Sequence, residues 1–183
     1  MEKKGWIMTR RLFLWLPFAS VVSLFAAFWI GLKQPGDHTI ASQVVGKTMP
    51  EFTTGPVLPG QTGFATADFR DGKPRLLNIF GSWCVPCLRE IPMLHRLKAA
   101  GAEIDGIAIH DSTADLSGFL AANGNPYARI GLDDDGRAQL AFGSAGVPET
   151  FVVDGNGKII YQHIGVVTDA DVPRLLAMLE VRP

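Results

Sequence analysis

The order of apolar segments in this 183-residue sequence predicts an α/β domain in which a mixed central sheet is flanked by helices. Three observations support that fold class. The apolar run Arg75–Phe80 is typical of a buried central strand. The segment at 84–101 that follows it has apolar residues at helical spacing and ends at a glycine. Further on, the tetrapeptide DGNG at 154–157 separates two apolar runs, which is a strong β-hairpin signal.

The other expected elements continue this alternation of strands and helices. In chain order they are a strand at 104–109, a helix at 113–122, a strand at 127–130, a short helix at 137–142, strands at 150–153 and 159–164, and a last helix at 171–179. The length of the chain allows one domain with a single core and an appended segment.

The appended segment is an uncharged apolar run at 12–32. As a helix it would rise about 30 Å, which is enough to cross a bilayer. Lysines and arginines precede the run, so the positive-inside rule keeps residues 1–11 in the cytoplasm and exports the residues after the run. A cleaved signal peptide is the alternative, although the run is longer than a usual signal-peptide core and no small-x-small cleavage site ends it.

We therefore expect four parts along the chain: a cytoplasmic N-terminus at 1–11, a transmembrane signal anchor at 12–32, a polar linker at 33–43 and a catalytic domain at 44–183. The predicted location is the cell inner membrane, crossed once, with the domain facing the periplasm.

Charge and residue counts exclude several function classes. The formal net charge is −1, so no clustered basic face for nucleic acid is expected. Two cysteines are too few for a four-cysteine zinc site, and the four histidines show no metal-binding spacing. We expect no metal, no bound cofactor and no nucleic-acid partner.

The two cysteines form a Cys-x-x-Cys motif at Cys84 and Cys87, a spacing that suits a reversible redox pair. Cys84 falls at a predicted helix N-terminus, where the helix dipole favours a thiolate. We expect Cys84 to be the exposed nucleophile and Cys87, a turn deeper, to resolve the mixed disulfide. The neighbours Trp83 and Pro86 favour this interpretation over two small core residues.

A second motif, GVPET at 146–150, directly precedes a predicted strand. A cis bond before Pro148 would leave the backbone groups of Val147 free to pair with an extended substrate beside Cys84. An ordinary trans turn proline is the alternative, and most X-Pro bonds in folded proteins are trans.

Together, WCVPC at 83–87 and VPET at 147–150 resemble the thioredoxin superfamily. The segments GNPY at 124–127, PETF at 148–151, DGNG at 154–157 and YQHIG at 161–165 are similar, in that order, to the TlpA-like CcmG/DsbE family of cytochrome c biogenesis. The resemblance covers about 44–180. It implies a thioredoxin fold with an inserted helix and strand at 113–130, and it implies a cis bond at Pro148.

The resemblance also implies an acidic site. Thioredoxins carry a buried Asp six residues before the first cysteine, where this chain has Asn78, as CcmG-like proteins do. The family's acidic residues would map onto Glu90, on the helix face of Cys87, and onto Glu149 after Pro148, and either would assist proton transfer or tune Cys87. A solvated helix residue is the alternative for Glu90. The stretch IHD at 109–111 departs from the Tyr-Lys-Asp of better-known members.

The implied activity is that of a periplasmic thiol:disulfide oxidoreductase that reduces the haem-attachment cysteines of apocytochrome c. A membrane dithiol protein of the DsbD or CcdA type would supply the electrons. One alternative is a general membrane-tethered reductase of the TlpA or ResA type with other substrates. Another is a Cu(I) chaperone with two thiolate ligands, although Sco-type copper proteins use Cys-x3-Cys and this chain has Cys-x2-Cys.

Overall fold

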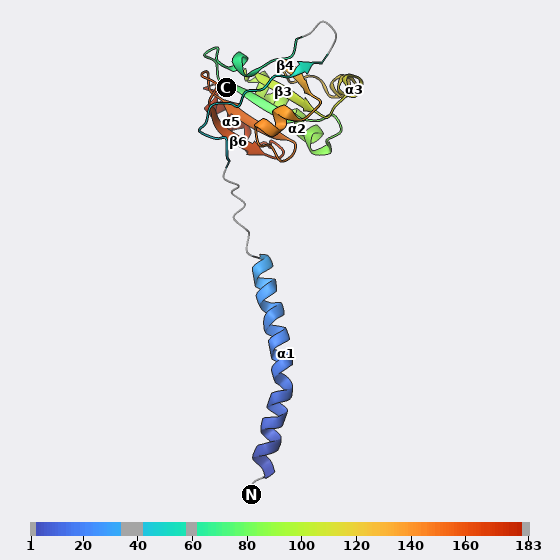
Figure 1. Ribbon diagram of the computed structural model, residues 1–183, viewed down its shortest axis with the longest axis vertical. Helices are drawn as coiled ribbons and strands as arrows, with labels where there is room; N and C mark the ends of the chain where they lie inside the picture. The colour runs from blue at the N-terminus through green and yellow to red at the C-terminus, as the bar shows by residue number, and fades with distance from the viewer. Residues whose placement is uncertain (1–2, 34–41, 58–61, 181–183) are drawn as a thin grey trace. The chain divides into compact units, whose positions relative to one another are not determined.

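The computed structural model describes residues 3–33, 42–57 and 62–180, and within the first range it describes the side chains of 15–31. The chain divides into two units, Met1–Ala41 and Ser42–Pro183. The first contains the helix α1 (Lys3–Lys33), drawn in blue in Figure 1. Over the part of the chain that the structure describes, no helix combines the length and the apolar character needed to cross a membrane. The predicted span at 12–32 and the linker at 33–43 both include residues outside the described side chains.

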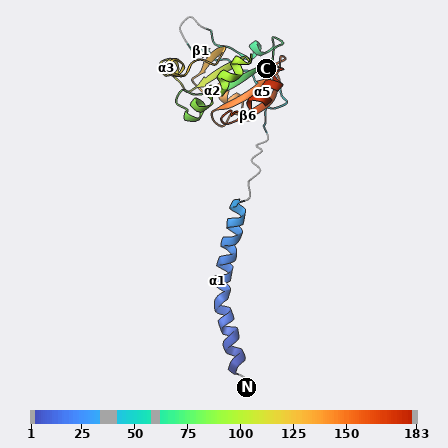
Figure 2. The ribbon, with the colours of Figure 1, turned by 180° about the vertical axis from the view of Figure 1, so that it is seen from behind.

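The second unit is built on a six-stranded mixed sheet with the order β1-β4-β3-β2-β5-β6. The central strands β2 (Arg75–Phe80), β3 (Ile104–Ile109) and β4 (Arg129–Asp133) run parallel to one another. Antiparallel neighbours complete the sheet: β1 (Gly55–Pro56) beside β4, and β5 (Glu149–Val153) followed by β6 (Ile159–Ile164) beside β2. Figure 2 shows β1 and β6 at opposite edges.

Helices cover both faces of this sheet. Alternate side chains of β2 point to opposite faces, with Leu76 and Phe80 on one and Leu77 and Ile79 on the other. The first face packs against α2 (Val85–Ala99), α3 (Thr113–Asn123) and α5 (Val172–Met178). The second packs against α4 (Arg137–Ala141), the 3₁₀ helix η1 (Thr66–Phe69) and the segment before η1. Because both faces are covered, all six residues of β2 are buried, and four of them are apolar.

The strand β2 nevertheless begins with a charged residue, Arg75, which is 2% exposed. Its guanidinium donates to Glu103 Oε1 at 2.8 Å and also pairs with Asp71 and with the buried Asp105. Arg129 Nη2 in turn donates to Asp105 Oδ2 at 2.6 Å. These pairings satisfy charges that would otherwise be costly to bury, and they join β2, β3 and β4 at the end of the sheet where β2 begins.

The predicted mixed sheet and hairpin are confirmed. In the hairpin, Asp154 N–H donates to Lys158 O at 2.9 Å and Gly157 adopts a positive φ of 78°. The strand predicted at 127–130 is wrong in its bounds, because β4 is Arg129–Asp133. Tyr127 N–H donates to Asn125 Oδ1 at 2.9 Å, which keeps the chain in a turn there, and parallel pairing with β3 extends β4 to Asp133. The short elements β1 and η1 were not predicted from the sequence.

Gly131 and Gly118 differ in the space around their Cα atoms, so alanine substitutions at the two positions should change the free energy of unfolding in opposite directions. A Cβ on Gly131 in β4 would lie 1.9 Å from Thr54 Oγ1, and that hydroxyl is fixed because it donates to Phe64 O and accepts from Phe64 N–H. We expect Gly131→Ala to lower the free energy of unfolding by about 2–3 kcal/mol. A Cβ on Gly118 in α3 meets nothing within 4 Å, so Gly118→Ala should raise the free energy of unfolding by about 0.5–1 kcal/mol. Equilibrium urea unfolding of the full-length variants measures both changes, and equal effects would contradict the packing described.

Candidate active site

The two cysteines of the predicted redox pair lie where β2 ends and α2 begins. Cys84 and Cys87 form a disulfide, with their Cα atoms 5.2 Å apart. Cys84 is the N-cap residue of α2, and its Sγ accepts a hydrogen bond from Cys87 N–H at 3.1 Å. Pro86 lies in the first helical turn, where the missing N–H costs no intrahelical bond. A thiolate at Cys84 would therefore gain both this hydrogen bond and the favourable end of the helix dipole.

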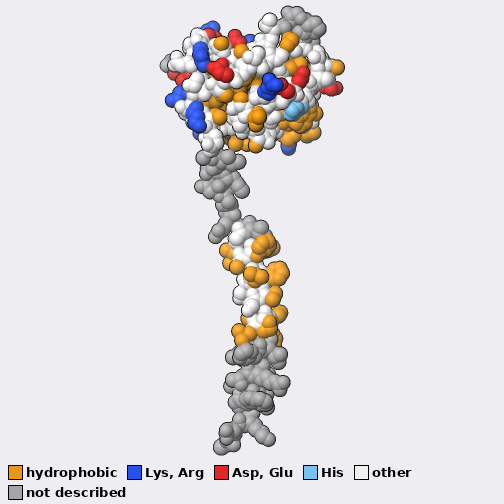
Figure 3. Space-filling model, viewed as in Figure 1, with side chains coloured by type: hydrophobic (Ala, Val, Ile, Leu, Met, Phe, Trp, Pro, Cys, Tyr) orange, Lys and Arg blue, Asp and Glu red, His pale blue; other side chains and the backbone are white. Residues whose placement is uncertain are grey.

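The expectation that Cys84 is exposed is wrong for the disulfide form. Only 4% of Cys84 is exposed, against 1% of Cys87, because its sulfur is bonded to Cys87 and the Val147 carbonyl oxygen lies 3.7 Å away. The residues around it are exposed instead: Trp83 by 56%, Val85 by 66% and Leu88 by 43%. Figure 3 shows hydrophobic side chains gathered over the start of α2. The surface around the covered sulfur of Cys84 is therefore apolar.

The Val147–Pro148 peptide bond is cis, as the resemblance implies. Pro148 is buried, and its carbonyl accepts a hydrogen bond from Gly165 N–H at 2.9 Å. Within the described residues, Val147 N–H donates to no other group. The backbone of Val147 thus lies beside the Cys84 sulfur with a donor available for a bound chain.

A buried polar cluster centred on Asn78 connects β2 to α2, the helix that follows Cys84. The Asn78 side-chain nitrogen donates to Glu90 Oε1 and to Thr150 Oγ1, both at 3.0 Å. Its oxygen accepts from the hydroxyl of Tyr127 at 2.9 Å. The second carboxylate oxygen of Glu90 accepts from Val167 N–H at 3.2 Å. The cluster joins β2, α2, β5 and the loop before α5.

Glu90 is therefore not the solvated helix residue that the sequence left open, because it is 0% exposed. Burial raises the pKa of its carboxyl to about 7, although the donors Asn78 and Val167 favour the charged form. Burial also raises the pKa of Tyr127, and the Glu90 charge raises it further. Glu90 can thus gain or lose a proton near neutral pH, one helical turn from Cys87.

The structure does not bring Glu149 together with Glu90. Glu149 pairs in register with Ile79, so its side chain shares the face of the sheet that carries Ile79, whereas Glu90 binds Asn78 on the other face. Glu149 is 3% exposed; its Oε1 accepts from Gln162 Nε2 at 3.0 Å, and its Oε2 has no hydrogen-bond partner among the described residues. Burial raises the pKa of this carboxyl as well.

The sequence did not single out Tyr127, Thr150 or Val167 as residues of the site. Thr150 and Tyr127 belong to the quoted segments PETF/VPET and GNPY, but nothing local shows that both reach Asn78. Val167 contributes only its backbone N–H, for which a sequence carries no signal.

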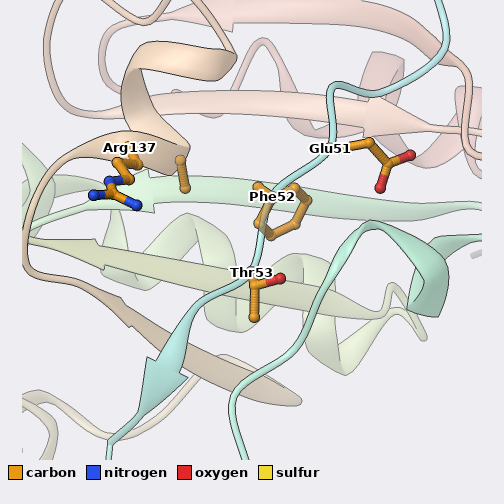
Figure 4. Close-up of a pocket in the computed structure, with 5 residues that line it drawn as sticks. Glu51, Phe52, Thr53 and Arg137 are labelled. Atoms are coloured by element: carbon orange, nitrogen blue, oxygen red, sulfur yellow. The ribbon is translucent and has the colours of Figure 1, made fainter.

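Cavities on the described part of the domain include two that differ in their relation to the site. One of about 600 Å³ adjoins the site and is lined by Ser82 and Trp83, by the loop after β3 and by α3. The other, of about 360 Å³, contains none of the predicted site residues. Figure 4 shows Phe52 between Glu51 and Arg137 in this second cavity.

Comparison with known proteins places this site in a family. The family model described as Redoxin matches residues 44–179. The chain belongs to the Redoxin family. Among its relatives, the thiol:disulfide interchange protein HelX of Rhodobacter capsulatus is 38% identical over 156 residues, covering 85% of this chain and 88% of HelX. The thiol:disulfide interchange protein DsbE of Escherichia coli K12 is 36% identical over 162 residues, covering 85% and 86%.

Solved structures of similar proteins agree with the assignment of this chain to the Redoxin family. A thioredoxin-family thiol:disulfide interchange protein from Chlorobium tepidum is 25% identical, with a TM-score of 0.58 over 72% of this chain and 94% of that one. A DsbF homologue from Corynebacterium diphtheriae is also 25% identical, with a TM-score of 0.61 over 73% and 87%. The protein therefore has a thioredoxin-like fold and is a thiol:disulfide oxidoreductase of the DsbE/HelX kind with a Cys84–Cys87 disulfide.

The raised pKa of Glu90 makes the stability of the Redoxin domain pH-dependent. The carboxyl titrates at about 7 in the folded state and at about 4.5 when unfolded, so the folded state binds its proton more tightly. This contribution to stability is complete below about pH 4.5 and is lost as the pH rises through about 7, by at most about 3 kcal/mol.

In Glu90→Gln the slope should become clearly smaller, because the Glu90 contribution is lost while that of Glu149, whose pKa is also raised, remains. Urea unfolding of the oxidised protein from about pH 4 to about pH 8 measures it. Glu51→Gln, at an exposed carboxylate that pairs with Arg70, is the control and should keep the wild-type slope. An unchanged slope in Glu90→Gln would assign the pH dependence to other groups.

Proposed function

We propose that this protein reduces the disulfide between the haem-attachment cysteines of apocytochrome c, outside the cytoplasm. The observation that carries the redox part is the Cys84–Cys87 disulfide at the N-terminus of α2, beside Val147 and the cis-proline. Support for this particular substrate comes from the likeness of four segments at 124–165 to the CcmG/DsbE family.

The proposed reaction starts from the dithiol form. The Cys84 thiolate attacks one sulfur of the substrate disulfide, a mixed disulfide forms, and the other substrate sulfur leaves as a thiolate. Cys87 then loses its proton and attacks Cys84 Sγ, which releases the second substrate sulfur and forms the Cys84–Cys87 disulfide. Two electrons pass from the protein to the substrate. The available N–H of Val147 pairs with the extended substrate during both steps.

Supporting roles follow for the other candidate residues. Glu90, whose pKa is about 7, accepts the proton from Cys87 in the second step. Trp83 bonds the Ile109 carbonyl through its indole N–H, and Pro86 lies in the first turn of α2. Both residues thereby help to fix the backbone around the nucleophile Cys84. Glu149 lies on the opposite face of the sheet, so its part is to hold the strand after Pro148 through Gln162 and not to move protons at Cys87.

A membrane dithiol protein of the DsbD or CcdA type would return the protein to its dithiol form. Its thiolate would attack the Cys84–Cys87 disulfide, and the same two steps would run in reverse. This donor is proposed from the family resemblance. No bound cofactor is required, because the cysteine thiols themselves carry the two electrons.

We also propose that residues 12–32 anchor the protein in the inner membrane, with the domain in the periplasm. The proposal rests on the uncharged sequence of this segment and on the lysines and arginines before it.

The full-length protein should stay in the membrane pellet after alkaline carbonate extraction, and protease added to spheroplasts should digest the domain. Leu24→Arg together with Val21→Arg, costing about 3 kcal/mol each, should reduce membrane retention. Release of a protein that lacks the N-terminal segment would instead identify a cleaved signal peptide.

Substrate trapping tests the proposed function directly. In a full-length Cys87→Ser variant the mixed disulfide at Cys84 cannot be resolved, so the physiological substrate should accumulate on it. We expect apocytochrome c, linked through a haem-site cysteine, to be identified by mass spectrometry of the trapped species. The double variant Cys84→Ser/Cys87→Ser should trap nothing.

Other outcomes would choose among the alternatives. Recovery of oxidase assembly factors in place of apocytochrome c would favour a general reductase. Stoichiometric Cu(I) binding with no disulfide reductase activity would favour the copper chaperone.

The proton-accepting role of Glu90 has its own kinetic test. Glu90→Gln should slow the resolution of a preformed mixed disulfide by about 10–100-fold near pH 7, because Cys87 loses its proton acceptor, and should leave the attack by Cys84 nearly unchanged. Quenched-flow analysis of the mixed disulfide separates the two steps. Equal slowing of both steps would point to a general loss of structure.

A further inference from the structure

The residues that lead into Cys84 form a tight turn. Cys84 N–H donates to Gly81 O at 3.1 Å, so Ser82 and Trp83 are the two middle residues of a four-residue turn. The orientation of this turn determines where the Cys84 sulfur lies relative to the first N–H groups of α2. In the disulfide form the bond to Cys87 also fixes that sulfur, but in the dithiol form only the backbone does.

The loop after β3 holds both middle residues of the turn. The two carboxylate oxygens of Asp111 accept from Ser82, one from its N–H and one from its hydroxyl, each at 2.6 Å. Short bonds to a charged acceptor are stronger than neutral ones. The indole Nε1 of Trp83 donates to Ile109 O at 3.2 Å, which ties the second middle residue to the same loop.

The close fit of the turn extends to Gly81. A Cβ on this residue would lie 2.7 Å from the indole ring of Trp83, so the ring folds over a position that only glycine can occupy without a shift. The indole is thereby held in one orientation beside Cys84, although 56% of Trp83 is exposed.

Between Ile109 and Asp111, His110 adopts a left-handed conformation with φ of 48°. This conformation is uncommon outside glycine, although histidine adopts it more often than most residues, and contacts with the surrounding chain help to hold it. Here His110 N–H donates to Asp133 O at 3.4 Å, and its ring Nδ1 lies 3.3 Å from Asp134 O. The end of β4 therefore fixes the bend at His110, which brings the Asp111 carboxylate within hydrogen-bond distance of Ser82.

We propose that Asp111 is a positioning residue for Cys84. It holds the turn at 81–84 so that, in the dithiol form, the Cys84 sulfur still accepts the hydrogen bond from Cys87 N–H. The inference rests on the proposed reaction, in which Cys84 is the nucleophile. Asp111 contacts neither sulfur, and it acts through Ser82. Its contribution is largest in the dithiol form, where no covalent bond replaces it.

The charge of the Asp111 carboxylate and its positioning role predict opposite changes in the pKa of the Cys84 thiol when that carboxylate is removed. Loss of a nearby negative charge would ease ionisation of the Cys84 thiol, whereas loss of the turn geometry would hinder it. Asp115 gives the matched control, since it lines the same cavity and bonds Ser112, not Ser82. Ser82→Ala removes one of the two hydrogen bonds without changing any charge.

The test is the pH dependence of iodoacetamide alkylation at Cys84 in the reduced full-length protein, followed by mass spectrometry. In Asp111→Asn the titration midpoint should rise by about one pH unit, which slows alkylation about tenfold below the midpoint. Ser82→Ala should shift it in the same direction by less, and Asp115→Asn should leave it unchanged or lower it. Thermal unfolding of each oxidised variant checks that it is folded.

An Asp111→Asn midpoint that is unchanged, or that falls as in Asp115→Asn, overturns the proposal. If Asp111→Asn does not fold, Ser82→Ala decides: a raised midpoint supports the role and an unchanged one overturns it. Alkylation involves no protein substrate, so this outcome is independent of whether Cys87→Ser traps apocytochrome c.

Discussion

The hydrogen bonds of the buried Asn78 side chain are the interaction on which the site depends. This one amide bonds Glu90 on α2, Thr150 on β5 and the hydroxyl of Tyr127 before β4. At 0% exposure no water competes for these partners, and a lost partner would leave a buried polar group unsatisfied. The helix that carries the cysteines and the strand that follows the cis-proline are therefore held in one arrangement relative to β2.

The same cluster explains why two glutamates near the two motifs differ in their surroundings. Among the described residues, buried Glu90 accepts hydrogen bonds on both carboxylate oxygens, while Glu149, on the other face of the sheet, accepts one on Oε1 from Gln162. Burial raises both pKa values, but only Glu90 shares a helix face with Cys87. Environment, rather than residue type, separates a group suited to proton transfer from one that supports a strand.

Local patterns allowed much of this protein to be predicted. The apolar run of β2, the turn chemistry at 154–157 and the position of Cys84 at a helix start depend on neighbours in the chain. The rest depends on residues far apart: burial of Cys84 depends on Val147, and the environment of Glu90 depends on Val167. The bounds of β4 were missed because pairing with β3 sets them, and β1 is too short to show an alternating pattern.

The cysteines follow β2 and the cis-proline precedes β5. These two strands are neighbours inside the sheet, and neither is an edge strand. Strands in such positions exchange their amide protons last, because opening them requires the strands outside them to separate first. Fraying at β1 would thus leave the cysteines and the cis-proline in register, whereas β6 and Gly165 directly after it bond Glu149 and Pro148. The β1 edge of this sheet can therefore accept insertions and deletions while the reacting atoms keep their geometry.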